Sequence, residues 1–278
     1  MNGVCAVALG VILLAACGEN RTYPTKATFE PAAVTPLSCV PNLDGKIDAN
    51  ELQAALDVPE SLVVSPAGVR RSVSLAGATD GLGRRVWDFA VDYADDQLAR
   101  ISATSLTGKW FAASFPNGQY VAPIDLGASL LGVYSADGSN LLLHGIASAV
   151  EAPPEGKTLL VYTAPVAIHR YPLEVGKTWV SVGVVQNGTI RGLPYAGRDT
   201  YQVNVDASGR LELTDLAFTQ ALRIRTRVTV EPAVGASVTR RQVSFFFECF
   251  GEVARATSLD NEPLEDFTTT AELRRLGL

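Results

Sequence analysis

Short alternating runs of apolar and polar residues recur along most of this chain, and they constrain its fold more strongly than any other feature. In the sharpest run, 222–230, Leu222, Ile224 and Val228 share one side while Arg223, Arg225 and Arg227 share the other. A period of two is that of a β-strand with one buried face. Turn-forming residues separate such runs at intervals of roughly ten residues, as in antiparallel all-β folds. We therefore predict a mainly β protein, built as an antiparallel sandwich or a curved, barrel-like sheet, with one short N-terminal helix.

Segments rich in Gly, Asn, Asp and Ser mark the predicted turns. The segment 237–250 carries Phe245, Phe246 and Phe247 in succession, so both of its faces are apolar, which predicts a central strand. The proline-rich segment 152–156 is either a long loop or the division between two lobes. We predict hairpins that join 109–115 to 119–124, 130–134 to 140–146, 178–185 to 189–193, and 200–206 to 210–213.

An uncharged apolar run, 4–16, opens the chain and is too short to span a bilayer as a helix. Such a run closed by small residues is typical of a signal peptide. It ends in Leu14-Ala15-Ala16-Cys17, which resembles the lipobox of bacterial lipoproteins, although the segment before it has no Lys or Arg. The resemblance implies that Cys17 is acylated and becomes the mature N-terminus. The alternative is an ordinary cleaved signal peptide with an incidental cysteine.

These features divide the chain into a signal peptide at 1–16, a flexible tether rich in Pro, Thr and Ala at 17–38, and a β domain at 39–278. The lipoprotein resemblance implies a location in the cell envelope, anchored by lipid to the outer membrane and facing the periplasm or the cell surface. The net charge of −6 gives no basic surface for nucleic acid or anionic lipid. Burial of the acyl chains would therefore hold the protein on its membrane.

The compartment assigns the four cysteines to different roles. Cys5 leaves with the signal peptide and Cys17 takes the lipid, so Cys39 and Cys249 remain as a pair in oxidising surroundings. We predict a disulfide between them; two buried free thiols or half of a metal site are the alternatives. In the chain-entropy model, closing a loop of about 210 residues stabilises the fold by roughly 5 kcal/mol.

The segment 42–51 resembles part of a calcium loop of the EF-hand or dockerin kind. With Gly45 at the loop's invariant glycine, the spacing places four oxygen-bearing side chains at ligand positions, and the first position holds a valine. The alternative is a structural cap, with a turn at Asp44-Gly45 and a capping box that opens a short helix over 49–56. We expect the cap, with weak calcium binding at best and no other cofactor. The candidate ligands are Asn42, Asp44, Asp48 and Glu51.

Catalytic motifs are absent from the sequence: it has no G-x-S-x-G, H-E-x-x-H, P-loop or G-x-G-x-x-G pattern. The two histidines, His144 and His169, have no recognisable partners. The run 171–179, which contains P-L-x-V-G-x-x-W, and the segment 248–253 are similar to uncharacterised exported β-proteins. That resemblance implies an all-β fold and no particular activity.

Three hypotheses for the function follow. The first, which the missing motifs favour, is a non-enzymatic lipoprotein whose β scaffold binds a protein partner or an apolar ligand. The second is a lipid-anchored hydrolase or carbohydrate-active enzyme that uses Asp and Glu, and a cleft with two carboxyl groups would favour it. The third is a calcium-dependent interaction module built on 42–51.

Overall fold

The computed structural model describes residues 39–277, and the protein from Cys39 onward forms one compact unit. It is a mainly β protein with two short 3₁₀ helices, η1 (Ala49–Leu52) and η2 (Ala112–Ser114). The predicted fold class is confirmed. The strands are β1 (Lys46–Ile47), β2 (Glu60–Val64), β3 (Arg71–Ser72), β4 (Ala78–Thr79), β5 (Arg85–Asp88), β6 (Gln97–Ile101), β7 (Thr104–Ser105), β8 (Tyr120–Pro123), β9 (Leu130–Ala136), β10 (Asn140–Ser148), β11 (Leu159–Arg170), β12 (Leu173–Glu174), β13 (Thr178–Ile190), β14 (Leu193–Glu212), β15 (Ala217–Pro232), β16 (Val238–Phe247), β17 (Gly251–Ser258) and β18 (Thr269–Leu276).

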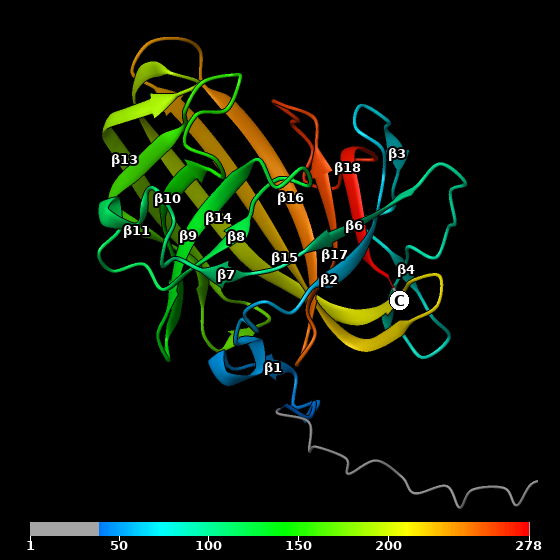
Figure 1. The fold of residues 1–278 in the computed structure, drawn as a ribbon. Coiled ribbons are helices and arrows are strands. Elements are labelled where there is room, and N and C mark those ends of the chain that lie inside the picture. Colours follow the sequence, from blue (N-terminus) through cyan, green and yellow to red (C-terminus); the bar gives the residue numbers. More distant parts are fainter. Residues whose placement is uncertain (1–38, 278) are drawn as a thin grey trace, which may run out of the picture. The chain divides into compact units, whose positions relative to one another are not determined.

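One 16-stranded sheet contains every strand except β1 and β12, which pair with each other. Its main strand order runs β6-β2-β18-β17-β16-β15-β14-β13-β11-β10-β9-β8-β7. Three short strands attach beside this order: β3 pairs with β18, β5 with β14, and β4 with β5. The two outermost strands, β6 and β7, follow one another in sequence with only Ser102 and Ala103 between them. Because the chain passes directly from one edge of the sheet to the other, the sheet curls back on itself and encloses an interior (Figure 1).

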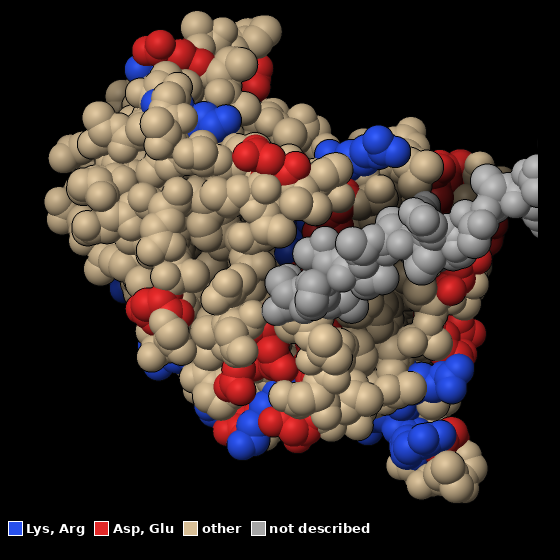
Figure 2. Space-filling view, turned by 60° about the horizontal axis from the view of Figure 1, so that its bottom comes forward, with Lys and Arg blue, Asp and Glu red and all other residues tan. Residues whose placement is uncertain are grey.

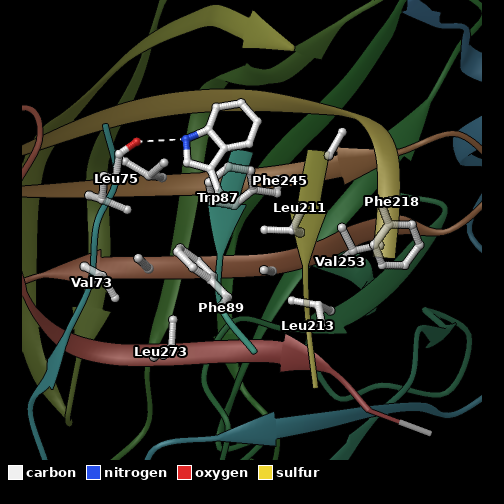
Figure 3. Packing of buried hydrophobic residues seen from close by; sticks show 14 of the residues in the cluster. Val73, Leu75, Trp87, Phe89, Leu211, Leu213, Phe218, Phe245, Val253 and Leu273 are labelled. Atoms are coloured by element: carbon white, nitrogen blue, oxygen red, sulfur yellow. Dashed lines mark hydrogen bonds between the residues drawn. The ribbon is translucent and has the colours of Figure 1, made fainter. Parts of the chain in front are cut away.

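The outer face of the curled sheet carries the first hydrophobic core. The segment around β5 crosses strands β15 to β18, and the Trp87 ring packs 4.8 Å from that of Phe245. The indole N–H of Trp87 donates to the carbonyl of Leu75 at 3.0 Å, which satisfies the one polar atom of this buried side chain (Figure 3). Phe245 and Phe247 belong to this core while Phe246 faces the interior, so the predicted central strand is confirmed.

The inner face carries a further apolar cluster. Leu222, Ile224 and Phe246 lie in it, together with Trp179 and Ile47 of the N-terminal segment. The arginines that alternate with Leu222 and Ile224 lie on the outer face, where Arg223 and Arg225 bind the carboxylate of Asp206. The alternation in 222–230 therefore divides the inner from the outer side of the sheet, as predicted.

Two predicted hairpins are wrong, because 186–188 and 207–209 are irregular points inside long strands. β13 and β14 each continue through these segments, with register shifts at Val185/Gly188 and around 205–211. At Gly209, an added Cβ would lie 2.5 Å from the carbonyl oxygen of Arg85, so this glycine permits β5 to approach β14. At Gly188, a Cβ would lie 2.6 Å from the Val185 side chain. Both glycines serve bulges and close packing rather than turns.

The remaining predictions of hairpins, helix and lobes are confirmed only in part. The hairpin 130–134 to 140–146 is confirmed as β9 and β10. The segment 109–115 forms no strand and instead contains η2, so its predicted hairpin is wrong. The predicted helix 49–56 is a 3₁₀ helix that ends at Leu52. The segment 152–156 lies in the connection between the paired strands β10 and β11, so it joins strands of one sheet rather than two lobes.

Candidate binding cavity beneath the N-terminal cap

The segment 39–58, which we refer to as the cap, is tied covalently to the end of β16. Cys39 and Cys249 form a disulfide with a Cα–Cα distance of 5.6 Å, so the predicted pairing is confirmed. The neighbouring Glu248 is buried, and its Oε2 accepts hydrogen bonds from the backbone N–H groups of Asn42 and Leu43, both at 2.7 Å. A further attachment is the pairing of β1 with β12, which buries Ile47 against Leu173. The cap is therefore fastened at several points.

The calcium-like residues of the cap use their oxygens in local hydrogen bonds. Asn42 Oδ1 accepts from the N–H of Asp44 at 2.8 Å, and Asp44 Oδ1 accepts from the N–H of Lys46 at 2.9 Å. Asp48 and Glu51 form the predicted capping box, in which Glu51 Oε2 accepts from the Asp48 N–H at 2.8 Å. Within residues 39–277, no group of three or more His, Cys, Asp or Glu side chains is arranged to hold a metal ion. Calcium binding at 42–51 stays a prediction.

A cavity of about 370 Å³ lies between the cap and the inner face of the curled sheet. The cap contributes Leu52 and Val58, and the strands contribute apolar and aromatic side chains from both halves of the sheet. A site of this size that is mostly apolar with a few polar groups is typical of binding sites for small ligands. The apolar and aromatic strand residues that line it are Ile101, Tyr120, Tyr134, Leu141, Ile168 and Phe246.

Carboxylates outnumber cationic side chains in the lining of this cavity. Glu252 and Arg255 of β17 form a close pair, in which the guanidinium donates to Glu252 Oε2 from Nε at 2.9 Å and from Nη2 at 2.7 Å. Glu51 of the cap is held in the capping box. Glu60 of β2 is the third carboxylate, and it makes no hydrogen bond to any side chain or N–H group of the described chain.

Burial, and after it the negative charge of Glu252, raise the pKa of Glu60 to about 7, against the opposing effect of Arg274 and Arg255. Arg274 is itself paired with Glu272 at 2.7 Å on the neighbouring strand β18. Glu60 is therefore a partly buried carboxyl group that changes its charge near neutral pH.

His169 of β11 also lines the cavity, with only 8% of its surface exposed. Its ring lies edge-on to Phe246 at 5.0 Å, and its Nδ1 is buried with no hydrogen-bond partner within residues 39–277. Burial lowers the pKa of His169 to about 4, so the imidazole is neutral at physiological pH. A neutral imidazole offers one donor and one acceptor, and here neither is used by another side chain of the described residues.

Aromatic rings form another wall of the cavity. The rings of Tyr120 and Tyr134 are stacked, with centroids 5.6 Å apart and an interplanar angle of 21°. Tyr171 lies near His169, with ring centroids 6.1 Å apart, and burial raises its pKa to about 12. All three tyrosines are therefore neutral at physiological pH and present electron-rich ring faces and hydroxyl groups.

The residues predicted from the sequence and those that line the cavity overlap only in part. Cys39, Asp48 and Glu51 belong to the cap that covers it, and Cys249 ties the cap to the end of β16. Glu51 and Cys249 also line the cavity. Cys17 and the tether lie outside the described residues. His144 lies on β10, where its Nε2 is 2.7 Å from Ser135 Oγ, and is not part of the lining.

The sequence did not reveal this site, because its polar residues come from strands that are distant in sequence. These residues are Glu60, Glu252, Arg255 and His169. No spacing motif can link them. The only local signals were a single acid in an otherwise apolar strand, Glu60–Val64, and a histidine inside a strand.

No family model matches the chain, and no curated protein or solved structure matches it either. Within residues 39–277, no helix has the length and apolarity that a membrane-crossing segment needs. On one face of the molecule, acidic and basic side chains are interspersed among neutral ones (Figure 2).

Proposed function

We propose that this protein is a lipid-anchored lipoprotein of the cell envelope whose β scaffold binds a small apolar-bodied ligand, without catalysis. The observation that supports ligand binding is the cavity of about 370 Å³ beneath the cap. Apolar and aromatic side chains dominate its lining, and the buried Nδ1 of His169, one of its few polar groups, lacks a partner among the described residues. A protein interior rarely leaves such groups unpaired unless something else satisfies them.

A titration with the uncharged fluorescent probe N-phenyl-1-naphthylamine tests the binding function. We expect saturable fluorescence enhancement from the purified protein. The variant Ala122→Trp should weaken it at least tenfold, because Ala122 lines the cavity on β8 and a tryptophan there fills it. The matched control Ala67→Trp places the same ring on an exposed turn and should bind as the wild type does. Equal binding by Ala122→Trp and Ala67→Trp would refute the cavity as the site.

The anchor is a separate part of the proposal and rests on the Leu14-Ala15-Ala16-Cys17 sequence. Metabolic labelling with radioactive palmitate should mark the wild-type protein in its bacterial host and leave Cys17→Ser unlabelled. Equal labelling of the two would end the lipoprotein interpretation while leaving the cavity function intact.

A hydrolase is the second candidate, and one observation favours it. Two carboxyl groups, Glu60 and Glu252, line the same cavity, and Glu60 is protonated over much of the neutral range. An acid and a carboxylate in one cavity is the arrangement by which glycosidases work. A panel of 4-nitrophenyl glycosides tests it: turnover by the wild type that Glu60→Gln abolishes would replace the binding proposal with an enzyme.

A further inference from the structure

The charges that line the cavity are unbalanced, and this bears on which ligand it accepts. Among residues 39–277, three carboxylates line it, from Glu51, Glu60 and Glu252, against the single guanidinium of Arg255. The capping box holds Glu51, and Arg255 neutralises Glu252. The charge of Glu60 remains without a counter-ion among the described residues lining the cavity.

An acidic lining can be a solvated surface, but here a second side chain points to an occupant. His169 lines the same cavity, is more than nine-tenths buried, and leaves its Nδ1 without a hydrogen-bond partner among residues 39–277. A buried unpaired polar group costs about 1–3 kcal/mol, which a ligand or an ordered water can recover. The free carboxylate and the free imidazole thus lie on the same cavity, from β2 and β11 respectively.

The aromatic wall fits the same kind of ligand. This wall contains Tyr171 and the stacked rings of Tyr120 and Tyr134. The face of a tyrosine ring is the negative region of its quadrupole. Such faces attract an ammonium group and stabilise it further when it is removed from water. The neighbouring apolar residues Ile101, Leu141 and Ile168 suit an alkyl or aryl body.

We propose that the cavity binds a cationic amphiphile, a ligand with a protonated amine or quaternary ammonium head and a short apolar body, and that Glu60 pairs with the head. This inference rests on the proposed ligand-binding function. An anionic ligand would need Arg255, which Glu252 already holds through two hydrogen bonds, and would meet the unpaired carboxylate of Glu60. An uncharged ligand would leave the partly buried charge of Glu60 unpaired.

The affinity of the cavity for the cationic ligand depends on pH. The ionisable groups around Glu60 are Glu252 and Arg255 on β17, Arg274 and its partner Glu272 on β18, Tyr134 on β9, His169 on β11 and Glu51 of the cap. With the Glu60 pKa raised to about 7, the carboxyl is ionised at pH 8 and neutral at pH 5. The cation is therefore held more weakly at pH 5.

Calorimetric titration of the purified protein with three probes of one chain length tests the proposal: octylammonium chloride, octanol and sodium octanoate. At pH 8 we expect octylammonium to bind about tenfold or more tightly than octanol, and octanoate to bind less tightly than octanol. At pH 5 the octylammonium affinity should fall toward that of octanol. Glu60→Gln should reduce octylammonium binding to the octanol level at both pH values. The control Glu155→Gln, in the exposed β10–β11 connection, should behave as the wild type does.

The outcomes separate the inference from the function on which it rests. Equal affinity for octylammonium and octanol overturns the proposal that the ligand has a cationic head, and it leaves the proposed binding function of the cavity standing. The tightest binding by octanoate overturns the cationic head as well and assigns the head to Arg255 or Arg274. Binding by none of the three probes overturns the cavity function itself. Loss of octylammonium binding in both Glu60→Gln and Glu155→Gln overturns the role of Glu60.

Discussion

Glu60 on β2 and Glu252 on β17 line the same cavity, but within the described chain only Glu252 has a cationic partner, Arg255, which donates to its Oε2 at 2.7 and 2.9 Å. The two carboxyl groups therefore differ in role although both belong to one site. Glu252 is part of a paired structural unit. Glu60 forms no ion pair with the described residues of the cavity, so the free energy of unfolding should depend on its protonation state.

Glu60→Gln should make the protein more stable at pH 8 and leave its stability unchanged at pH 4. The pKa of Glu60 is raised from 4.5 to about 7, so the folded state holds a proton that the unfolded state releases, and stability falls as pH rises through this window. The glutamine removes this loss of unfolding free energy, which amounts to up to about 3 kcal/mol above pH 7. Urea denaturation at pH 4, 6 and 8 measures it. A parallel pH dependence in wild type and variant would contradict the buried, unpaired carboxyl.

His169→Leu should change the pH dependence in the opposite direction. The pKa of His169 is lowered to about 4, so the unfolded state binds a proton that the folded state refuses, and stability falls as pH drops from 6.5 toward 4. Replacing the imidazole removes an acid-side loss of about 3 kcal/mol. In the wild type the contributions of Glu60 and His169 oppose each other between about pH 4.5 and 6.5. The same urea series should therefore slope downward with pH in His169→Leu, and an unchanged slope would show that His169 is not buried as described.

Removing the disulfide by the double substitution Cys39→Ser and Cys249→Ser should lower the free energy of unfolding by roughly 2–5 kcal/mol, because the bond restricts the unfolded chain. The closed loop is long, with the cysteines 210 positions apart. Glu248→Ala isolates the non-covalent attachment of the cap. It removes the charged acceptor of the N–H groups of Asn42 and Leu43, and the loss of these two part-buried hydrogen bonds should cost about 2 kcal/mol. Non-reducing peptide mass spectrometry provides the control, and two alkylatable thiols in native protein would contradict the bridge.

Thermal melting curves recorded with chelator and with ~1 mM calcium should superimpose, since extracellular loops of this kind bind in the millimolar range at best. The side-chain oxygens of Asn42 and Asp44, and both oxygens of Glu51, already accept or share local hydrogen bonds. Asp48→Ala should still cost about 1 kcal/mol through loss of the capping box. A rise of several degrees with calcium that Asp44→Ala abolishes would instead establish the calcium loop.

The sequence predicted what depends on local alternation and missed what depends on distant strands. The faces of 222–230, the central position of Phe245 to Phe247 and the capping box follow from neighbouring residues, and all are confirmed. The glycines at 188 and 209 were interpreted as turns because a bulge and a turn use the same residue types. Only the paired strands distinguish the two: the pairing of β13 with β14 continues past 186–188, and the pairing of β14 with β15 continues past 207–209.

The cavity could not be predicted, because its existence depends on β6 and β7 lying at opposite edges of one sheet. That order places Glu60, Tyr134, His169 and Arg255 around one space, although they span almost two hundred positions. In the sequence, Glu60 is one acid beside an apolar strand, and His169 has no partner nearby. Nothing in either local pattern distinguishes a cavity wall from a solvated surface.

Methyl NMR of isoleucine-labelled protein, recorded with and without saturating N-phenyl-1-naphthylamine, tests the cavity directly. Ile101 and Ile168 line the cavity, whereas Ile190 and Ile224 are not among its lining residues. The aromatic probe should shift the methyl resonances of Ile101 and Ile168 by ring currents and leave those of Ile190 and Ile224 in place. Shifts confined to other isoleucines, or none at saturation, would contradict a binding site beneath the cap.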